Sequence, residues 1–210
     1  PTKDGTTKPN DGFDLTYSVS CSHEEAAGTY ENAIVPTGAE TQGNYKVTYV
    51  SGTFTINQAT RDEKDITVKN YKGVYDAASH SIRVNGTADG DKVEYSYDGG
   101  TTWSETLNQY TNVMAETTIK VRVTNPNYSN VIEKEGTVEI TPFEMTVIAN
   151  AATKNFGETD PNLTATETVT KAGTTRPDDQ NIDYKVSRGN QEAARTYPDS
   201  ILVKGDEIQG

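Results

Sequence analysis

A segment of thirty residues occurs twice in this chain, and no other feature constrains the fold as strongly. Residues 14–43 align with residues 181–210 at an offset of 167 without a gap, and 13 of the 30 positions are identical. A weaker correspondence lies at half that offset, where GTFTI at 52–56 aligns with GTVEI at 136–140. Self-similarity at a fixed period is typical of an array of small repeated domains, here of about 84 residues each.

The repeat also predicts where the domains begin and end, if two kinds of unit, A and B, alternate. We expect residues 1–58 to be the C-terminal part of a type A domain and residues 62–141 to be a complete type B domain. Residues 142–210 are then the N-terminal part of a second type A domain. The chain opens and closes in polar sequence within these units, so we expect it to be a piece of a longer protein.

The aliphatic composition favours strands over helices. The chain has 17 Val and 11 Ile against 4 Leu and 2 Met. Strands favour β-branched and aromatic residues, whereas helical domains use Leu, Met and Ala. The composition therefore predicts an all-β protein and argues against a helical bundle or an α/β enzyme. Because short runs alternate with turn signals every 8–12 residues, we expect tandem Ig-like antiparallel β-sandwich domains in an elongated arrangement.

Alternating side chains give the expected strands and cores. In the type A sequence, runs at 45–49 and 53–56 flank Ser51-Gly52 and predict a hairpin. In the type B domain, Tyr95 and Val121 are expected in the core. The expected strands of that domain lie near 66–69, 73–76, 80–84, 92–97, 101–104, 117–124 and 136–141.

The charge balance excludes several classes of partner. Thirty-one acidic residues against 19 basic ones give a net charge of −12, which argues against binding to nucleic acid or to an anionic membrane surface. No apolar run is long enough to span a bilayer, so no membrane insertion is expected. The single cysteine, Cys21, has no second cysteine with which to form an internal disulfide.

Several motifs resemble those of a known family. The closing run NYKVTYVSGTFTI at 44–56 resembles the final hairpin of bacterial MBG domains, which are repeat modules of cell-surface proteins. Residues 145–163 resemble the opening of the YGX type, although Phe156 stands where that type has Tyr. The middle domain is similar to related surface repeats through VYDA at 74–77, with Ala77 replacing the usual Gly, and VEYSYDGGTTW at 93–103. The resemblance implies Ig-like sandwiches in a secreted or wall-anchored protein of Gram-positive type, outside the cell, and supplies no catalytic residues.

The sequence offers little support for catalysis, cofactors or metal. His23 aligns with Asn190 in the second copy, so the repeat does not require an imidazole there, and His80 is expected at a solvated strand edge. No CxxC or HExxH motif indicates zinc. Acidic clusters at 62–65, 158–160 and 178–179 keep calcium open as an alternative, but no DxDxDG loop is present. We expect no enzymatic activity, no cofactor and no metal site.

Two further candidate sites are kept as alternatives. Sugar-binding sites stack rings on exposed aromatic faces, and the candidates of this kind are Trp103, Tyr97, Tyr110 and Tyr128. The competing interpretation is that Trp103 packs on the sandwich or caps its edge. An intramolecular isopeptide bond would need a Lys, an Asn and a buried acid on facing strands, with Lys69 or Lys120 and Glu139 as the candidates.

The leading functional hypothesis is structural: a stalk or spacer, or a segment of an adhesin, whose partners are neighbouring repeat domains. The alternative is a module that binds host mucin or glycan through the aromatics of the middle domain. The incomplete terminal units add a third expectation, since each carries strands that the other lacks. Strand 145–150 or 163–169 of one chain is expected beside 44–57 of the next, in head-to-tail complementation.

Overall fold

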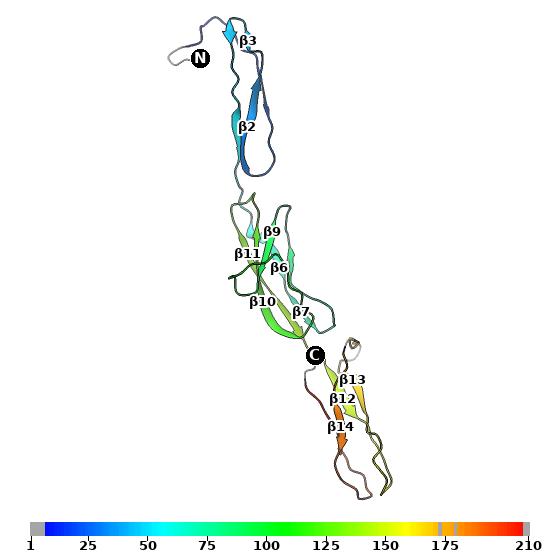
Figure 1. Cartoon of the computed structure of the whole chain (residues 1–210). Coiled ribbons are helices and arrows are strands. Elements are labelled where there is room, and N and C mark those ends of the chain that lie inside the picture. Colours follow the sequence, from blue (N-terminus) through cyan, green and yellow to red (C-terminus); the bar gives the residue numbers. More distant parts are fainter. Residues whose placement is uncertain (1–6, 172–173, 179, 208–210) are drawn as a thin grey trace. The chain divides into compact units, whose positions relative to one another are not determined.

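The computed structural model describes residues 7–171, 174–178 and 180–207, and these residues form β-strands, loops and one short 3₁₀ turn, η1 (Glu63–Asp65). No α-helix occurs among the described residues, which confirms the all-β class. The chain divides into two compact units. The first contains the described residues up to Asp65 together with Ala88–Lys92 and Val123–Ile132, and the second contains the remainder (Figure 1).

The first unit is built on a three-stranded antiparallel sheet with the order β1-β2-β5. Its strands are β1 (Ser18–Cys21), β2 (Gly28–Thr37) and β5 (Gly52–Ile56). Between Tyr30 and Ile34 the register of β2 against β5 shifts, and Asn32 there adopts a φ of 56°. An extra residue in one strand produces such a bulge.

The hairpin expected across Ser51-Gly52 is wrong, because its two runs pair with different strands. β4 (Tyr45–Lys46) pairs with β3 (Thr41–Gln42) through a turn at Gly43, whose φ of 56° suits a residue without a Cβ. β5 instead pairs with β2, and Phe54 lies opposite Tyr30. Cross-strand aromatic pairs of this kind stabilise a sheet, which favours the pairing of β5 with β2.

The second unit contains most of the buried apolar side chains. A four-stranded sheet has the order β7-β11-β10-β9. A separate pair of strands, β6 and β8, packs on β11. A Cβ added at Gly136 in β11 would lie 2.5 Å from Cγ1 of Val68 in β6 and 2.9 Å from Cγ2 of Ile82, the residue before β8. The strands are β6 (Thr67–Lys69), β7 (Tyr71–Val74), β8 (Arg83–Asn85), β9 (Lys92–Ser96), β10 (Met114–Thr124) and β11 (Ile132–Thr141). β7 runs parallel to β11, whereas antiparallel pairing was expected.

Val121 is fully buried at 0% exposure, which confirms its predicted place in the core. Tyr95 is only half-buried, and its neighbours Glu94 and Ser96 are the buried residues of β9. The reason is the turn that follows this strand, where Ser96 Oγ donates to Asp98 and accepts from the Gly100 amide. Glu94 is covered by the guanidinium of Arg122 at 2.8 Å.

The strand expected at 101–104 is replaced by a turn. The Asp98 carboxylate accepts hydrogen bonds from the amides of Thr101 and Thr102 and from the Thr102 hydroxyl. These bonds hold the pKa of Asp98 well below its usual range, the hydroxyl bond contributing most. A side chain that binds backbone groups in this way competes with a ladder, so only Ser104 remains bridged to Tyr95.

The last segment of the second unit consists of two hairpins. β12 (Met145–Ala149) pairs with β13 (Ala165–Val169), and β14 (Lys185–Arg188) pairs with β15 (Ile201–Lys204). β12 also lies against β15.

The two copies of the sequence repeat fold into the same hairpin. β1 and β14 occupy equivalent positions, and the pairing of Ser18 with Thr37 recurs as Lys185 with Lys204. The hydrogen bond from Tyr30 Oη to the Ala26 carbonyl recurs from Tyr197 to Ala193. Asn32 and Asp199, also 167 apart, both have positive φ. The repeat in the sequence is therefore also a repeat in the structure.

Candidate functional site

The proposed sugar-stacking residues are half-buried, and Trp103 is the clearest case. The guanidinium carbon of Arg122 lies 4.3 Å from the centre of the Trp103 ring, and Trp103 Nε1 donates to the Gly100 carbonyl at 3.1 Å. A cation held over an indole face in this way is attracted by the ring quadrupole. One face of the indole therefore already has a partner within the protein.

The three tyrosines also have partners within the chain. Tyr97 Oη donates to the Thr106 carbonyl and accepts from the Asn108 amide. Burial raises the pKa of Tyr97, and nearby Tyr110 adds to the increase. Tyr128, which belongs to the first unit, lies under the Arg61 guanidinium at 5.5 Å. The ligand role of Trp103, Tyr97, Tyr110 and Tyr128 stays a prediction.

Both histidines stack on aromatic rings. His23 lies 4.3 Å from the Phe54 ring, and His80 lies 3.9 Å from the Tyr71 ring. His80 Nε2 also lies 2.8 Å from Asp76, and this hydrogen bond lowers the pKa of the Asp76 carboxyl. These contacts support a packing role for each imidazole. Cys21 is a free, exposed thiol.

Glu139 and Lys120, two of the residues considered for an isopeptide bond, form ion pairs with other partners. The Glu139 carboxylate lies 2.6 Å from Lys72 Nζ, whereas Lys120 pairs with Glu135 at 3.5 Å. Glu139 therefore has Lys72 as its ion-pair partner, and neither Lys69 nor Lys120 takes that place. Among residues 7–171, 174–178 and 180–207, no three His, Cys, Asp or Glu side chains are grouped so as to hold a metal ion.

A buried ion pair forms the first polar network that sequence reasoning missed. Arg61 Nη1 lies 2.6 Å from Asp91 Oδ2, and the two side chains are 7% and 1% exposed. Asn125 donates to the same carboxylate at 2.8 Å. Burial alone would raise the pKa of Asp91, but the hydrogen bonds from Arg61, the Ala88 amide and Asn125 outweigh it and lower that pKa.

This network joins residues that follow β5 to loops far along the chain, all within the first unit. Ala59 exchanges backbone hydrogen bonds with Asn127 and Ser129. Asn127 Oδ1 accepts from the Ala27 amide at 2.8 Å, which ties the repeated hairpin to the same loop. The sequence of the linker, NQATRDEKD at 57–65, is polar throughout, so its composition did not distinguish the buried Arg61 from its solvated neighbours.

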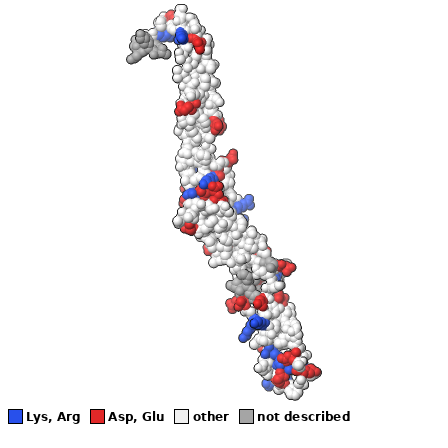
Figure 2. Space-filling model, viewed as in Figure 1, with Lys and Arg blue, Asp and Glu red and all other residues white. Residues whose placement is uncertain are grey.

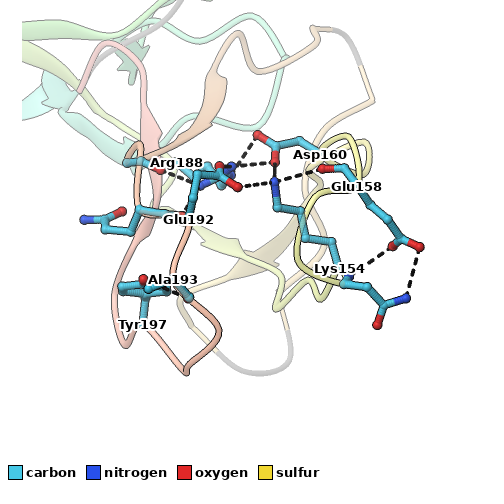
Figure 3. A network of polar contacts seen from close by, with 10 residues as sticks. Lys154, Glu158, Asp160, Arg188, Glu192, Ala193 and Tyr197 are labelled. Carbon is cyan, nitrogen blue, oxygen red and sulfur yellow. Dashed lines mark hydrogen bonds and ion pairs between the residues drawn. The ribbon is translucent and has the colours of Figure 1, made fainter.

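A second network lies in the last segment and uses two residues of the YGX-like motif. Lys154 contacts Asp160 at 2.9 Å and Glu192 at 2.8 Å, and Arg188 contacts the same two carboxylates at 2.5 Å (Figure 3). Hydrogen bonds from Arg188 and Lys154 lower the pKa of Asp160 to about 2. Figure 2 shows several places on the face drawn where Lys or Arg side chains lie beside Asp or Glu side chains.

These four charged residues also line an open groove of about 960 Å³ in the last segment. One wall comes from the stretch that begins in β12, with Val147, Phe156 and Leu163, and the other from the stretch that ends in β15, with Tyr197 and Leu202. Phe156 is 76% exposed. The ion network therefore links the two walls, and apolar side chains between them remain uncovered.

Comparison with known proteins supports the resemblance seen in the sequence. The family model of the MBG domain (YGX type) matches residues 2–55, which confirms the suspected family for this part of the chain. No curated protein and no solved structure matches the chain. Among the described residues, no helix has the length and hydropathy needed to cross a membrane.

Proposed function

Because residues 2–55 are an MBG-type repeat, we propose that this chain is a non-catalytic, extracellular repeat region of a bacterial surface protein, acting as a stalk, spacer or adhesin segment. A repeat domain of a bacterial surface protein is what the family match suggests. Its location outside the cell, at the wall or surface, its Gram-positive source and its neighbouring repeat domains as partners belong to the same proposal.

The observation that carries the spacer role is the buried network around Arg61. A spacer transmits position only if the residues between repeats are held in place. Here Ala27, Ala59 and Arg61 are hydrogen-bonded to loops 88–92 and 123–132. A buried pair whose partners are all satisfied specifies one geometry, whereas a solvated linker would sample many.

Distance measurement within the first unit tests this role. Spin labels at Thr29→Cys and Asp89→Cys, in a Cys21→Ser background, report on the two sides of the network, and both positions are exposed. We expect a narrow distance distribution that broadens in Asn127→Ala. Asn44→Ala, at an exposed position, is the matched control and should leave the distribution narrow. A broad distribution in the chain with intact Asn127 would contradict the spacer role.

The glycan-binding alternative is tested separately on a glycan and mucin array with the whole chain. The side chains of Trp103, Tyr97 and Tyr128 have partners within the protein, so the spacer proposal expects no specific binding. Specific binding that is lost in Trp103→Ala and kept in an exposed control such as Val74→Ala would instead support the alternative.

A further inference from the structure

Where the chain enters its middle segment (residues 59–141), it runs parallel to the loop that precedes β11. Ala59 forms a parallel bridge with Tyr128 and exchanges backbone hydrogen bonds with the residues on either side of it. The side chain of Asn130 continues this pairing, because it accepts from the Arg61 amide at 2.9 Å and donates to the Arg61 carbonyl at 3.0 Å. All four residues belong to the first unit, and their contact is called the entry ladder.

A second parallel contact, called the exit ladder, lies in the second unit where the chain leaves the middle segment. β7 pairs in parallel with the last four residues of β11. The Tyr75 amide extends the ladder by donating to the Thr141 carbonyl at 2.8 Å, and the Thr141 hydroxyl donates to the Gly73 carbonyl at 3.2 Å. Lys72 and Glu139 add an ion pair across the two strands at 2.6 Å.

The partners in the two ladders have nearly the same separation in sequence. Arg61 and Asn130 are 69 positions apart, and Asn70, which accepts from the Thr137 amide next to the exit ladder, is 67 positions from its partner. The N-terminal end of one strand and the C-terminal end of the other lie at opposite ends of a parallel ladder. Tension along the chain therefore pulls the two strands of each ladder past each other.

From this topology we propose that the middle segment is a mechanical clamp, which resists tension along the chain because both ladders are loaded in shear. The hydrogen bonds of a sheared ladder bear the load together, whereas bonds pulled apart from one end break one after another. The use of such a clamp rests on the proposed spacer role, since a spacer in a surface protein carries tension along its length.

Burial adds to the resistance of both ladders. In the exit ladder, Val138 and Ile140 are buried. In the entry ladder, the Arg61 guanidinium is held at 2.6 Å by the buried Asp91 carboxylate. Hydrogen bonds are electrostatically stronger where water is excluded, so these side chains raise the force at which the ladders fail.

Single-molecule pulling of the whole chain in two directions tests the exit ladder. In a Cys21→Ser background, handles at Lys69→Cys and Glu144→Cys load β7 and β11 in shear, because they lie before β7 and after β11. Handles at Val74→Cys and Glu144→Cys pull on the C-terminal ends of both strands and open the same ladder pair by pair. All three handle positions are exposed. At one pulling speed, we expect the shear geometry to unfold at several times the force of the other.

The lengths released identify the unfolding event in both geometries. Each pair of handles should release nearly the same length of chain, roughly 240 Å at about 3.5 Å per residue. Forced unfolding reports the unfolding rate along the pulling direction, so urea unfolding of both handle variants serves as the control for equal stability. Equal unfolding forces in the two geometries would overturn the clamp.

Two isosteric variants locate the resistance. Thr141→Val removes the hydroxyl that donates to the Gly73 carbonyl and should lower the unfolding force in the shear geometry. Thr137→Val makes the same change on the same face of β11, at a hydroxyl with no hydrogen bond to the described residues, and should leave the force unchanged. An unchanged force in Thr141→Val would show that the resistance arises outside this ladder.

The outcome can be separated from that of the spacer proposal, which is tested by distances within the first unit. Narrow distance distributions together with equal forces in the two pulling directions would leave the spacer role standing and overturn the clamp. Broad distributions together with a higher force in shear would support the clamp and contradict the spacer role.

Discussion

Truncation of Val121 probes the core on which the middle of the chain depends. Val121 lies in β10 with no exposed surface, flanked along the same face by buried Ile119 and Val123. Val121→Ala removes two buried methyl groups, worth about 0.8 kcal/mol each on transfer to water. The cavity left behind adds to this, so we expect a loss of roughly 2 kcal/mol in the free energy of unfolding. For a domain of this size that corresponds to a fall of about 10 °C in Tm.

Trp103 provides the assay, because it is the only tryptophan and lies in the same part of the chain. Urea unfolding followed by its fluorescence reports on the sheet that holds Arg122 and Val121. Val74→Ala is the matched control, since it makes the same chemical change at an exposed strand position and should cost under about 0.5 kcal/mol. If Val121→Ala and Val74→Ala unfold at the same urea concentration as the unmodified chain, the assignment of the core face is wrong.

Two further predictions concern the buried ion pair and metal. Asp91→Asn leaves the Arg61 guanidinium without its nearest carboxylate. We expect this change to lower the free energy of unfolding of the first unit by about 3–5 kcal/mol, measured by urea unfolding. Asp89→Asn, at an exposed position in the same loop, is the control and should be nearly neutral. Because the folded-state pKa of Asp91 is lowered, its contribution is complete above about pH 4 and is lost as pH falls through that lowered pKa, so the difference between Asp91→Asn and the unmodified chain should shrink on acidification. Removal of divalent cations with a chelator should leave the Tm unchanged, and a fall in Tm that calcium restores would reinstate a calcium site.

The all-β class and the repeat could be predicted from the sequence. Strand propensity is a property of local residues, and a repeat is found by comparing the sequence with itself. The ratio of Val and Ile to Leu and Met predicted the all-β class, which the structure confirms. The offset of 167 predicted that residues 14–43 and 181–210 would fold alike, and their hairpins share register, a tyrosine hydrogen bond and a positive φ. Alternation along β10 placed Val121 in the core for the same reason.

Strand pairing was decided only in the tertiary structure, since alternation shows that a run is a strand without showing its neighbour. The run at 52–56 was expected to pair with 45–49, yet it pairs with β2, where Tyr30 meets Phe54. Likewise, strict alternation placed Tyr95 inside, but the turn at Asp98 and the Arg122 side chain cover the opposite face of β9.

The polar networks could not be predicted from the sequence for a related reason. Arg61 and Asp91 are 30 positions apart, and Lys154 and Glu192 are 38 apart. Nothing in a charged stretch shows which of its members will be buried, because a charge leaves water only when folding brings a partner to it from elsewhere in the chain. The sequence by itself therefore determined the class, the repeat and the periodic core positions of this protein. The tertiary structure alone decided which strands are paired and which charges are buried.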